Sequence, residues 1–127
     1  CKNIKKMSTL LRKKGIKFGL AINPSTPIDG LIKNIKFVDL LLVMTVWPGF
    51  AGQKIIPSTF KKIAKLREFI DKNNLKIPIE VDGGIKINNV SRLIKSGANI
   101  IVSGTGIFNT KDYKKTTEAM LRVIENG

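Results

Sequence analysis

Four short apolar segments alternate with amphipathic ones along this chain, and no other feature of the sequence restricts its fold as strongly. The apolar segments span residues 16–22, 37–46, 77–81 and 99–103. Each ends in a turn that contains glycine or proline, and apolar residues recur at helical spacing between these segments. Regular alternation of strand and helix is typical of a parallel sheet with right-handed crossovers. The sequence therefore predicts one α/β domain over residues 1–127, with four parallel strands and flanking helices.

The strand predicted at residues 77–81 ends in Asp82-Gly83-Gly84. The carboxyl ends of parallel strands meet at one edge of the sheet, where ligands bind. Asp82 is the acidic residue at such an end, which makes it a candidate acid/base group or metal ligand. The simpler alternative is a turn, because Asp-Gly is a common turn pair. Glu80 shares the parity of Asp82, and we expect it to be an interior polar residue.

Glycine also follows the last predicted strand, in Gly104-Thr105-Gly106 before a short helix. Two glycine turns at consecutive strand ends predict a phosphate site, because their backbone N–H groups can approach an anion closely. Plain turns are the alternative. The small residues of Pro48-Gly49-Phe50-Ala51-Gly52 predict either a mobile lid or a simple connection.

The charge and the cysteine and histidine content restrict which partners and metal sites the chain can have. The chain carries 23 Lys and Arg against 9 Asp and Glu, a net charge of +14. Such a charge could attract nucleic acid or an anionic substrate. The basic residues are spread along the helices without interleaved aromatic residues, so we expect no nucleic-acid partner and interpret the charge as a solvated face. With one cysteine and no histidine, the chain has neither an internal disulfide nor a Cys/His metal cage of its own. The absence of a long apolar run and of a signal-peptide pattern predicts a cytoplasmic protein without membrane contact.

Details of two helices are also predicted. Asn88 is expected to cap the helix that ends at Gly97, and Thr110 the helix over 111–125. The inward face of the latter is expected to carry Tyr113, Thr117, Met120, Leu121 and Ile124.

Three motifs together resemble the ribulose-phosphate 3-epimerase family: residues 44–53 (MTVWPGFAGQ), 81–84 (VDGG) and 102–108 (VSGTGIF). Residues 23–27 (NPSTP) resemble the family's turn after its fifth strand. The resemblance aligns the chain with the C-terminal half of the family's (β/α)8 barrel, strands 5 to 8.

The resemblance implies an isomerase of the pentose phosphate pathway that interconverts ribulose 5-phosphate and xylulose 5-phosphate at C3. Such enzymes use two aspartates and an enediolate held by one divalent metal ion, Zn, Fe, Mn or Co. Asp82 matches the second aspartate, both proton donor and metal ligand, and Met44 matches a site-lining methionine. The residues that match substrate and phosphate contacts are Gly49, Phe50, Ala51, Gly52, Asp82, Gly83, Gly84, Gly104 and Thr105.

The chain also departs from the family. Trp47 stands where the family usually has a polar residue, and Ala51 replaces a glycine, as in the allulose-6-phosphate 3-epimerases. The first aspartate and the histidine ligands belong to the half that this sequence lacks. We therefore expect the chain to be inactive alone, its metal site not to be completed by its own residues, and its open strand edges to make it a homo-oligomer. Two alternatives stay open: an allulose-6-phosphate 3-epimerase, and a non-catalytic basic half-barrel that binds phosphate or nucleic acid.

Overall fold

The computed structural model describes residues 3–126, in which four strands form one sheet. The strands are β1 (Gly19–Ile22), β2 (Leu40–Met44), β3 (Ile79–Asp82) and β4 (Ile100–Val102). They run parallel in the order β1-β2-β3-β4, which confirms the predicted topology. The helices are α1 (Ile4–Arg12), α2 (Ile28–Ile32), α3 (Ser58–Lys72), α4 (Val90–Lys95), α5 (Thr105–Phe108) and α6 (Tyr113–Glu125), with a 3-10 turn η1 at Ile35–Phe37.

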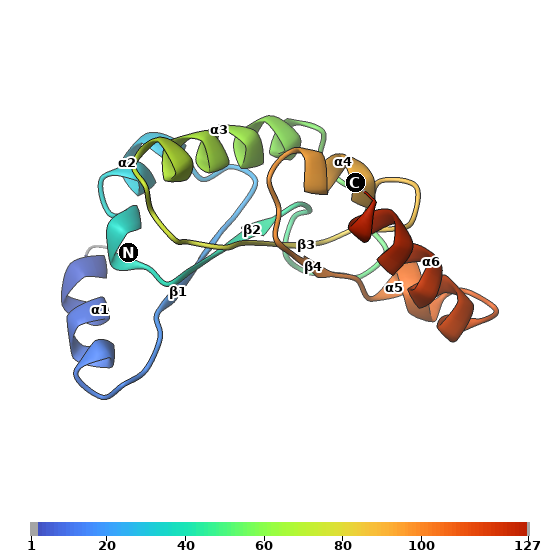
Figure 1. Cartoon of the computed structure of the whole chain (residues 1–127), viewed down its shortest axis with the longest axis horizontal. Coiled ribbons are helices and arrows are strands. Elements are labelled where there is room, and N and C mark those ends of the chain that lie inside the picture. The colour runs from blue at the N-terminus through green and yellow to red at the C-terminus, as the bar shows by residue number, and fades with distance from the viewer. Residues whose placement is uncertain (1–2, 127) are drawn as a thin grey trace.

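The helices cover only one face of this sheet (Figure 1). α2, α3 and α4 lie above the strands, α1 lies at the β1 end, and α5 and α6 lie at the β4 end. In the part of the chain that the structure describes, nothing packs on the opposite face. The molecule is thus half of a closed barrel in its architecture.

The core lies between the sheet and its helices, and it is aliphatic. Alternate residues of the two central strands point into it and are fully buried: Leu41, Val43, Ile79 and Val81. They pack against a buried stripe of α3 formed by Ile63, Leu66 and Ile70. Each of these buried side chains contributes about 1.5–3 kcal/mol through removal from water.

The intervening residues form what we call the open face. The strand register places Leu42 beside Glu80, and Met44 beside Asp82. Glu80 therefore shares the face of Asp82, as its parity predicts. On β4, Ile100 and Val102 point the same way and remain exposed.

β1 is shorter than predicted, because pairing begins at Gly19 rather than Ile16. The backbone N–H of Phe18 donates to the Asp39 carboxylate (2.8 Å), so this donor is not available to a neighbouring strand. Asp39 also accepts from the Arg12 guanidinium (2.8 Å), which ties α1 to the start of β2.

Both predicted helix caps are wrong by one or two residues. Asp112 caps α6, accepting the N–H of Lys115 (2.9 Å), whereas the Thr110 hydroxyl donates to the Ile107 carbonyl (2.6 Å). α4 is preceded by Asn89 rather than Asn88, and the Asn89 side chain accepts the N–H of Lys86 (2.9 Å).

The inward face predicted for α6 is only partly correct. Met120 is buried, but Tyr113 and Leu121 are 53% and 49% exposed. The sheet ends at β4, and α6 packs mainly against α4 and α5, so part of its apolar surface stays exposed. Tyr113 instead meets the edge of Phe108, with ring centroids 5.6 Å apart. No helix in residues 3–126 is long and apolar enough to cross a membrane.

Candidate active site

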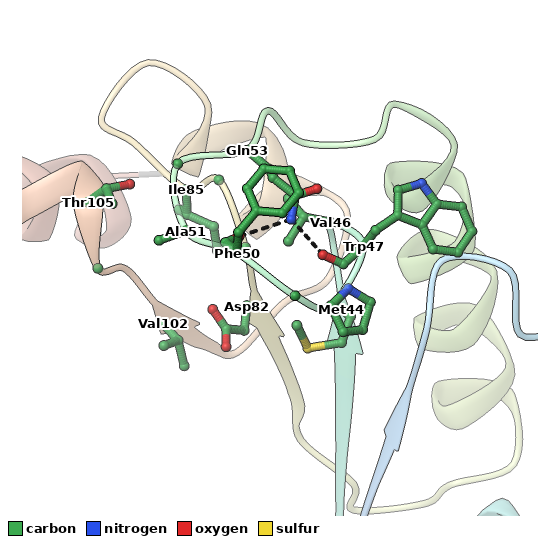
Figure 2. A pocket seen from close by; sticks show the side chains of 16 residues that line it. Met44, Val46, Trp47, Phe50, Ala51, Gln53, Asp82, Ile85, Val102 and Thr105 are labelled. Carbon is green, nitrogen blue, oxygen red and sulfur yellow. Dashed lines mark hydrogen bonds between the residues drawn. The ribbon is translucent and has the colours of Figure 1, made fainter.

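One row of residues crosses the sheet at its carboxyl edge. Met44 ends β2, Asp82 ends β3 and Val102 ends β4, and the register pairs them in that order. Their side chains lie together on the open face, beneath the loop that follows β2 (Figure 2). The Asp82 carboxylate is thus flanked by two apolar side chains and open to a ligand that approaches this face.

Thr45 fixes the backbone on which Asp82 stands. Its N–H donates to the Asp82 carbonyl (2.8 Å), and its hydroxyl lies 2.9 Å from the same oxygen and 2.6 Å from the Gly83 carbonyl. Thr45 is fully buried, so these bonds are protected from water. The ends of β2 and β3 are therefore held in one fixed arrangement.

The turn after Asp82 requires both of its glycines. Gly83 has φ +122° and Gly84 has φ +65°, values that favour glycine. A Cβ on Gly83 would overlap the Val46 side chain, and one on Gly84 would stand 2.5 Å from the Gln53 carbonyl oxygen. The turn therefore packs directly against the loop that follows β2.

That loop covers residues 47–53 and closes over the carboxyl edge. The Ile56 N–H donates to the Thr45 carbonyl (2.8 Å), and this bond closes the base of the loop. Gly49 and Gly52 have φ values of +148° and +82°. Phe50 at the tip is 74% exposed, and the Trp47 indole, 52% exposed, points away from Asp82 (Figure 2). The bulky ring at position 47 thus leaves the space above the carboxylate free.

The turn that follows β4, at residues 103–106, is joined to the Gly83-Gly84 turn through Ile85. The Ser103 hydroxyl donates to the Ile85 carbonyl (2.9 Å), and Gly106 packs so closely on the same oxygen that a Cβ there would overlap it. Gly104 and Thr105 therefore stand next to Gly83 and Gly84 at the edge of one cavity.

This cavity has a volume of about 330 Å³ and opens onto the carboxyl edge. It brings together every residue that the sequence singled out for the site: Met44, Gly49, Phe50, Ala51, Gly52, Asp82, Gly83, Gly84, Gly104 and Thr105. Its lining is completed by Val46, Trp47, Pro48, Gln53, Ile85 and Val102. A volume of this size matches the lower end of small-molecule sites.

Sequence reasoning missed two residues that shape the site. Thr45 is the one hydroxyl within the apolar segment of β2, and Gln53 directly follows the glycine loop. Both lie within the 44–53 motif, and each carries a polar side chain beside apolar or small residues, which is the signal that could have drawn attention to them.

The described residues do not form a complete metal site. Within residues 3–126, no three His, Cys, Asp or Glu side chains gather closely enough to hold an ion. Asp82 supplies one carboxylate at the cavity, and the rest of its lining is apolar, glycine or neutral polar.

Residues 1–108 match the family model described as the ribulose-phosphate 3 epimerase family. The chain belongs to this family. Among relatives named ribulose-phosphate 3-epimerase, the protein of Buchnera aphidicola from Acyrthosiphon pisum is 40% identical over 97% of this chain and 54% of its own length. The Escherichia coli K12 protein is 41% identical over 87% of this chain and 49% of its own. This epimerase-family chain thus spans about half the length of the curated relatives it matches.

Solved structures support the fold alone. The 3-hexulose-6-phosphate synthase of Salmonella typhimurium superimposes with a TM-score of 0.69 at 19% identity, covering 97% of this chain and 56% of that one. A tryptophan synthase α-subunit from Pyrococcus furiosus gives 0.64 at 19% identity, with coverages of 96% and 47%. Both have TIM-barrel folds, so the epimerase-family chain is a four-stranded half of such a barrel.

Proposed function

We propose that this chain forms the C-terminal half of the active site of a sugar-phosphate 3-epimerase that interconverts ribulose 5-phosphate and xylulose 5-phosphate. The observation that carries the proposal is the Asp82 carboxylate, which lies at the carboxyl edge between Met44 and Val102 and adjoins two glycine turns. The relatives are named ribulose-phosphate 3-epimerase, which supports this substrate.

In this proposal Asp82 exchanges a proton with C3 of the bound ketose phosphate. A carboxylate performs such a step when its oxygen comes within hydrogen-bond reach of the carbon's proton. Thr45 keeps the backbone of Asp82 in place while the proton moves. Epimerisation also needs a second acid/base group on the opposite side of C3, and the single carboxylate at this cavity does not provide it.

The substrate phosphate is proposed to lie against the turns that contain Gly83, Gly84, Gly104 and Thr105. Their backbone N–H groups can approach a dianion closely because three of the four residues have no Cβ. Gly49, Phe50, Ala51 and Gly52 would cover the sugar from above and exclude water.

A divalent ion, Zn, Fe, Mn or Co, is proposed to bind with Asp82 as one ligand. Such an ion would stabilise negative charge on a substrate oxygen. Its other ligands would have to come from outside residues 3–126, because the described side chains do not complete a site. We therefore propose that the chain does not turn over alone. The open edges of β1 and β4 support self-association into a homo-oligomer when no other polypeptide covers them.

The test combines this chain with the N-terminal half of a relative and one of the four metals. Deuterium incorporation from D₂O at C3 of ribulose 5-phosphate is then measured. We expect exchange, and a loss of about 100-fold or more in Asp82→Asn. Asp71→Asn, on the exposed surface of α3, is the matched control. No exchange in the folded, metal-loaded assembly would contradict the proposal.

The same assembly distinguishes the substrate. Ala51, in place of the usual glycine of the 47–53 loop, is the observation that favours a six-carbon ketose such as allulose 6-phosphate. Faster turnover of ribulose 5-phosphate than of allulose 6-phosphate supports the pentulose, and the reverse supports the hexulose.

A further inference from the structure

The side-chain amide of Gln53 bridges two carbonyl groups of its own loop. Its Nε2 donates to the Trp47 carbonyl (2.6 Å) and to the Phe50 carbonyl (2.9 Å), drawn as dashed lines in Figure 2. A primary amide nitrogen carries two hydrogens, so both of its donors are used inside the loop. The opposite orientation of the amide would set its oxygen against two carbonyl oxygens, which is repulsive.

These two bonds fix the direction of the loop's peptide groups. In a trans peptide the N–H points opposite to the C=O. With the Phe50 carbonyl held on the side of Gln53, the Ala51 N–H faces away from Gln53. Gly49 and Gly52 give the loop backbone freedom on either side of this peptide, and the Gln53 amide donates the hydrogen bond that favours the observed orientation.

Gln53 also joins the loop to the turn that follows Asp82. Its backbone carbonyl packs against Gly84, while its side chain holds Trp47 and Phe50. Trp47, Phe50, Ala51 and Gly52 are exposed, so few other contacts hold the loop down. The conformation of the loop over the cavity therefore depends on this one amide.

We propose that Gln53 is a positioning residue that latches the 47–53 loop over the sugar-phosphate site. This inference rests on the proposed function for the identity of the ligand. When the amide donors are removed, the loop opens and the anion is held less tightly, although the sheet and its core are unchanged.

The test uses the single tryptophan of the chain, Trp47, as its reporter. Gln53→Met keeps the side-chain length and removes both donors, and Gln53→Ala serves as the second variant. The matched control is Asn73→Leu, which removes another amide-to-carbonyl bond, to Phe69 (2.8 Å), at the far end of α3. Acrylamide quenching of Trp47, inorganic phosphate affinity and the thermal midpoint are measured for each.

Because a hydrogen bond contributes about 1 kcal/mol, the two Gln53 variants should raise the phosphate dissociation constant about fivefold to tenfold. Quenching of Trp47 should increase in both variants, while their thermal midpoints should be similar to that of Asn73→Leu. Unchanged quenching in both folded variants would overturn the latch, and so would undiminished phosphate affinity. If the wild type binds no phosphate, the anion site of the proposed function is contradicted. The Gln53 latch is then tested by Trp47 quenching alone.

Discussion

Gly84 packs against the Gln53 carbonyl so closely that a Cβ on Gly84 would stand 2.5 Å from that oxygen. The same Cβ would stand 2.9 Å from the Ile55 N–H nitrogen. The turn beside Asp82 and the base of the loop that covers the cavity are therefore in direct backbone contact.

Gly84→Ala should lower the free energy of unfolding by about 2 kcal/mol or more. The new Cβ meets backbone atoms, and φ +65° is unfavourable for alanine. Urea denaturation measures the change. Gly30→Ala is the control: its Cβ enters open space within α2, and we expect a gain of up to about 1 kcal/mol. Equal effects of the two changes would contradict the close packing at Gly84.

Thr45→Val should destabilise the protein by about 1–3 kcal/mol. Valine has nearly the same shape but no hydroxyl, so the Gly83 carbonyl loses its Thr45 partner. Thr45→Ser, which keeps the hydroxyl, should recover part of the loss in urea denaturation. Thr9→Val is the matched control, because the Thr9 hydroxyl only bonds back to Lys5 on an exposed helix surface. A cost at Thr45 no larger than at Thr9 would show that the tie between β2 and β3 is dispensable.

The strands, their order and the edge that carries the site follow from the sequence, because strand and helix periodicity is local and crossover handedness is general. For the same reason, the sequence also places Asp82 and the glycine turns at this edge, since they lie at or after strand ends. Thr45, Gln53 and Lys62 were not found. Thr45 bonds to Gly83 and Lys62 bonds to Pro24, each across 38 positions of sequence. Spacing patterns predict only contacts between residues that are close in sequence. For α6, periodicity located an apolar stripe but did not tell whether a neighbour covers all of it.

Lys62→Met should loosen the turn that follows β1. The Lys62 ammonium on α3 donates to the carbonyls of Asn23 (3.1 Å), Pro24 (2.5 Å) and Thr26 (2.8 Å), and burial lowers its pKa. Removing the ammonium leaves the Pro24 and Thr26 carbonyls without this donor, while the Asn23 carbonyl keeps the Thr26 N–H (3.0 Å). We therefore expect a loss of about 1–3 kcal/mol and faster amide exchange over residues 23–26. Lys61→Met, at the exposed neighbouring position, is the control. Unaltered exchange in Lys62→Met would contradict this tie.

The Asp39 carboxylate should set part of the acid stability. The Phe18 N–H, followed by the Arg12 guanidinium, lowers the pKa of Asp39 below its ordinary value of 3.8. A lowered folded-state pKa stabilises the fold above the unfolded value, and this stability is lost as pH falls through the folded value. Asp39→Asn should therefore reduce stability at neutral pH and flatten its decline below about pH 4. Urea midpoints between pH 2 and 7 measure this, with Asp71→Asn as the control of equal charge change. An unchanged acid decline in Asp39→Asn would contradict it.

The open face should drive self-association of the isolated chain. Ile100 and Val102 are exposed there on β4, an edge strand whose outer backbone groups have no partner strand in the described sheet. Apolar edges of this kind pair with one another, and a lysine on the strand opposes such pairing. Sedimentation velocity of the wild type should therefore give dimers or larger species, whereas Val102→Lys should shift the population toward monomer. Ala64→Lys adds the same charge on the exposed surface of α3 and should leave the association unchanged. A wild type that sediments as a clean monomer, or an equal shift in both variants, would show that the open face does not mediate association.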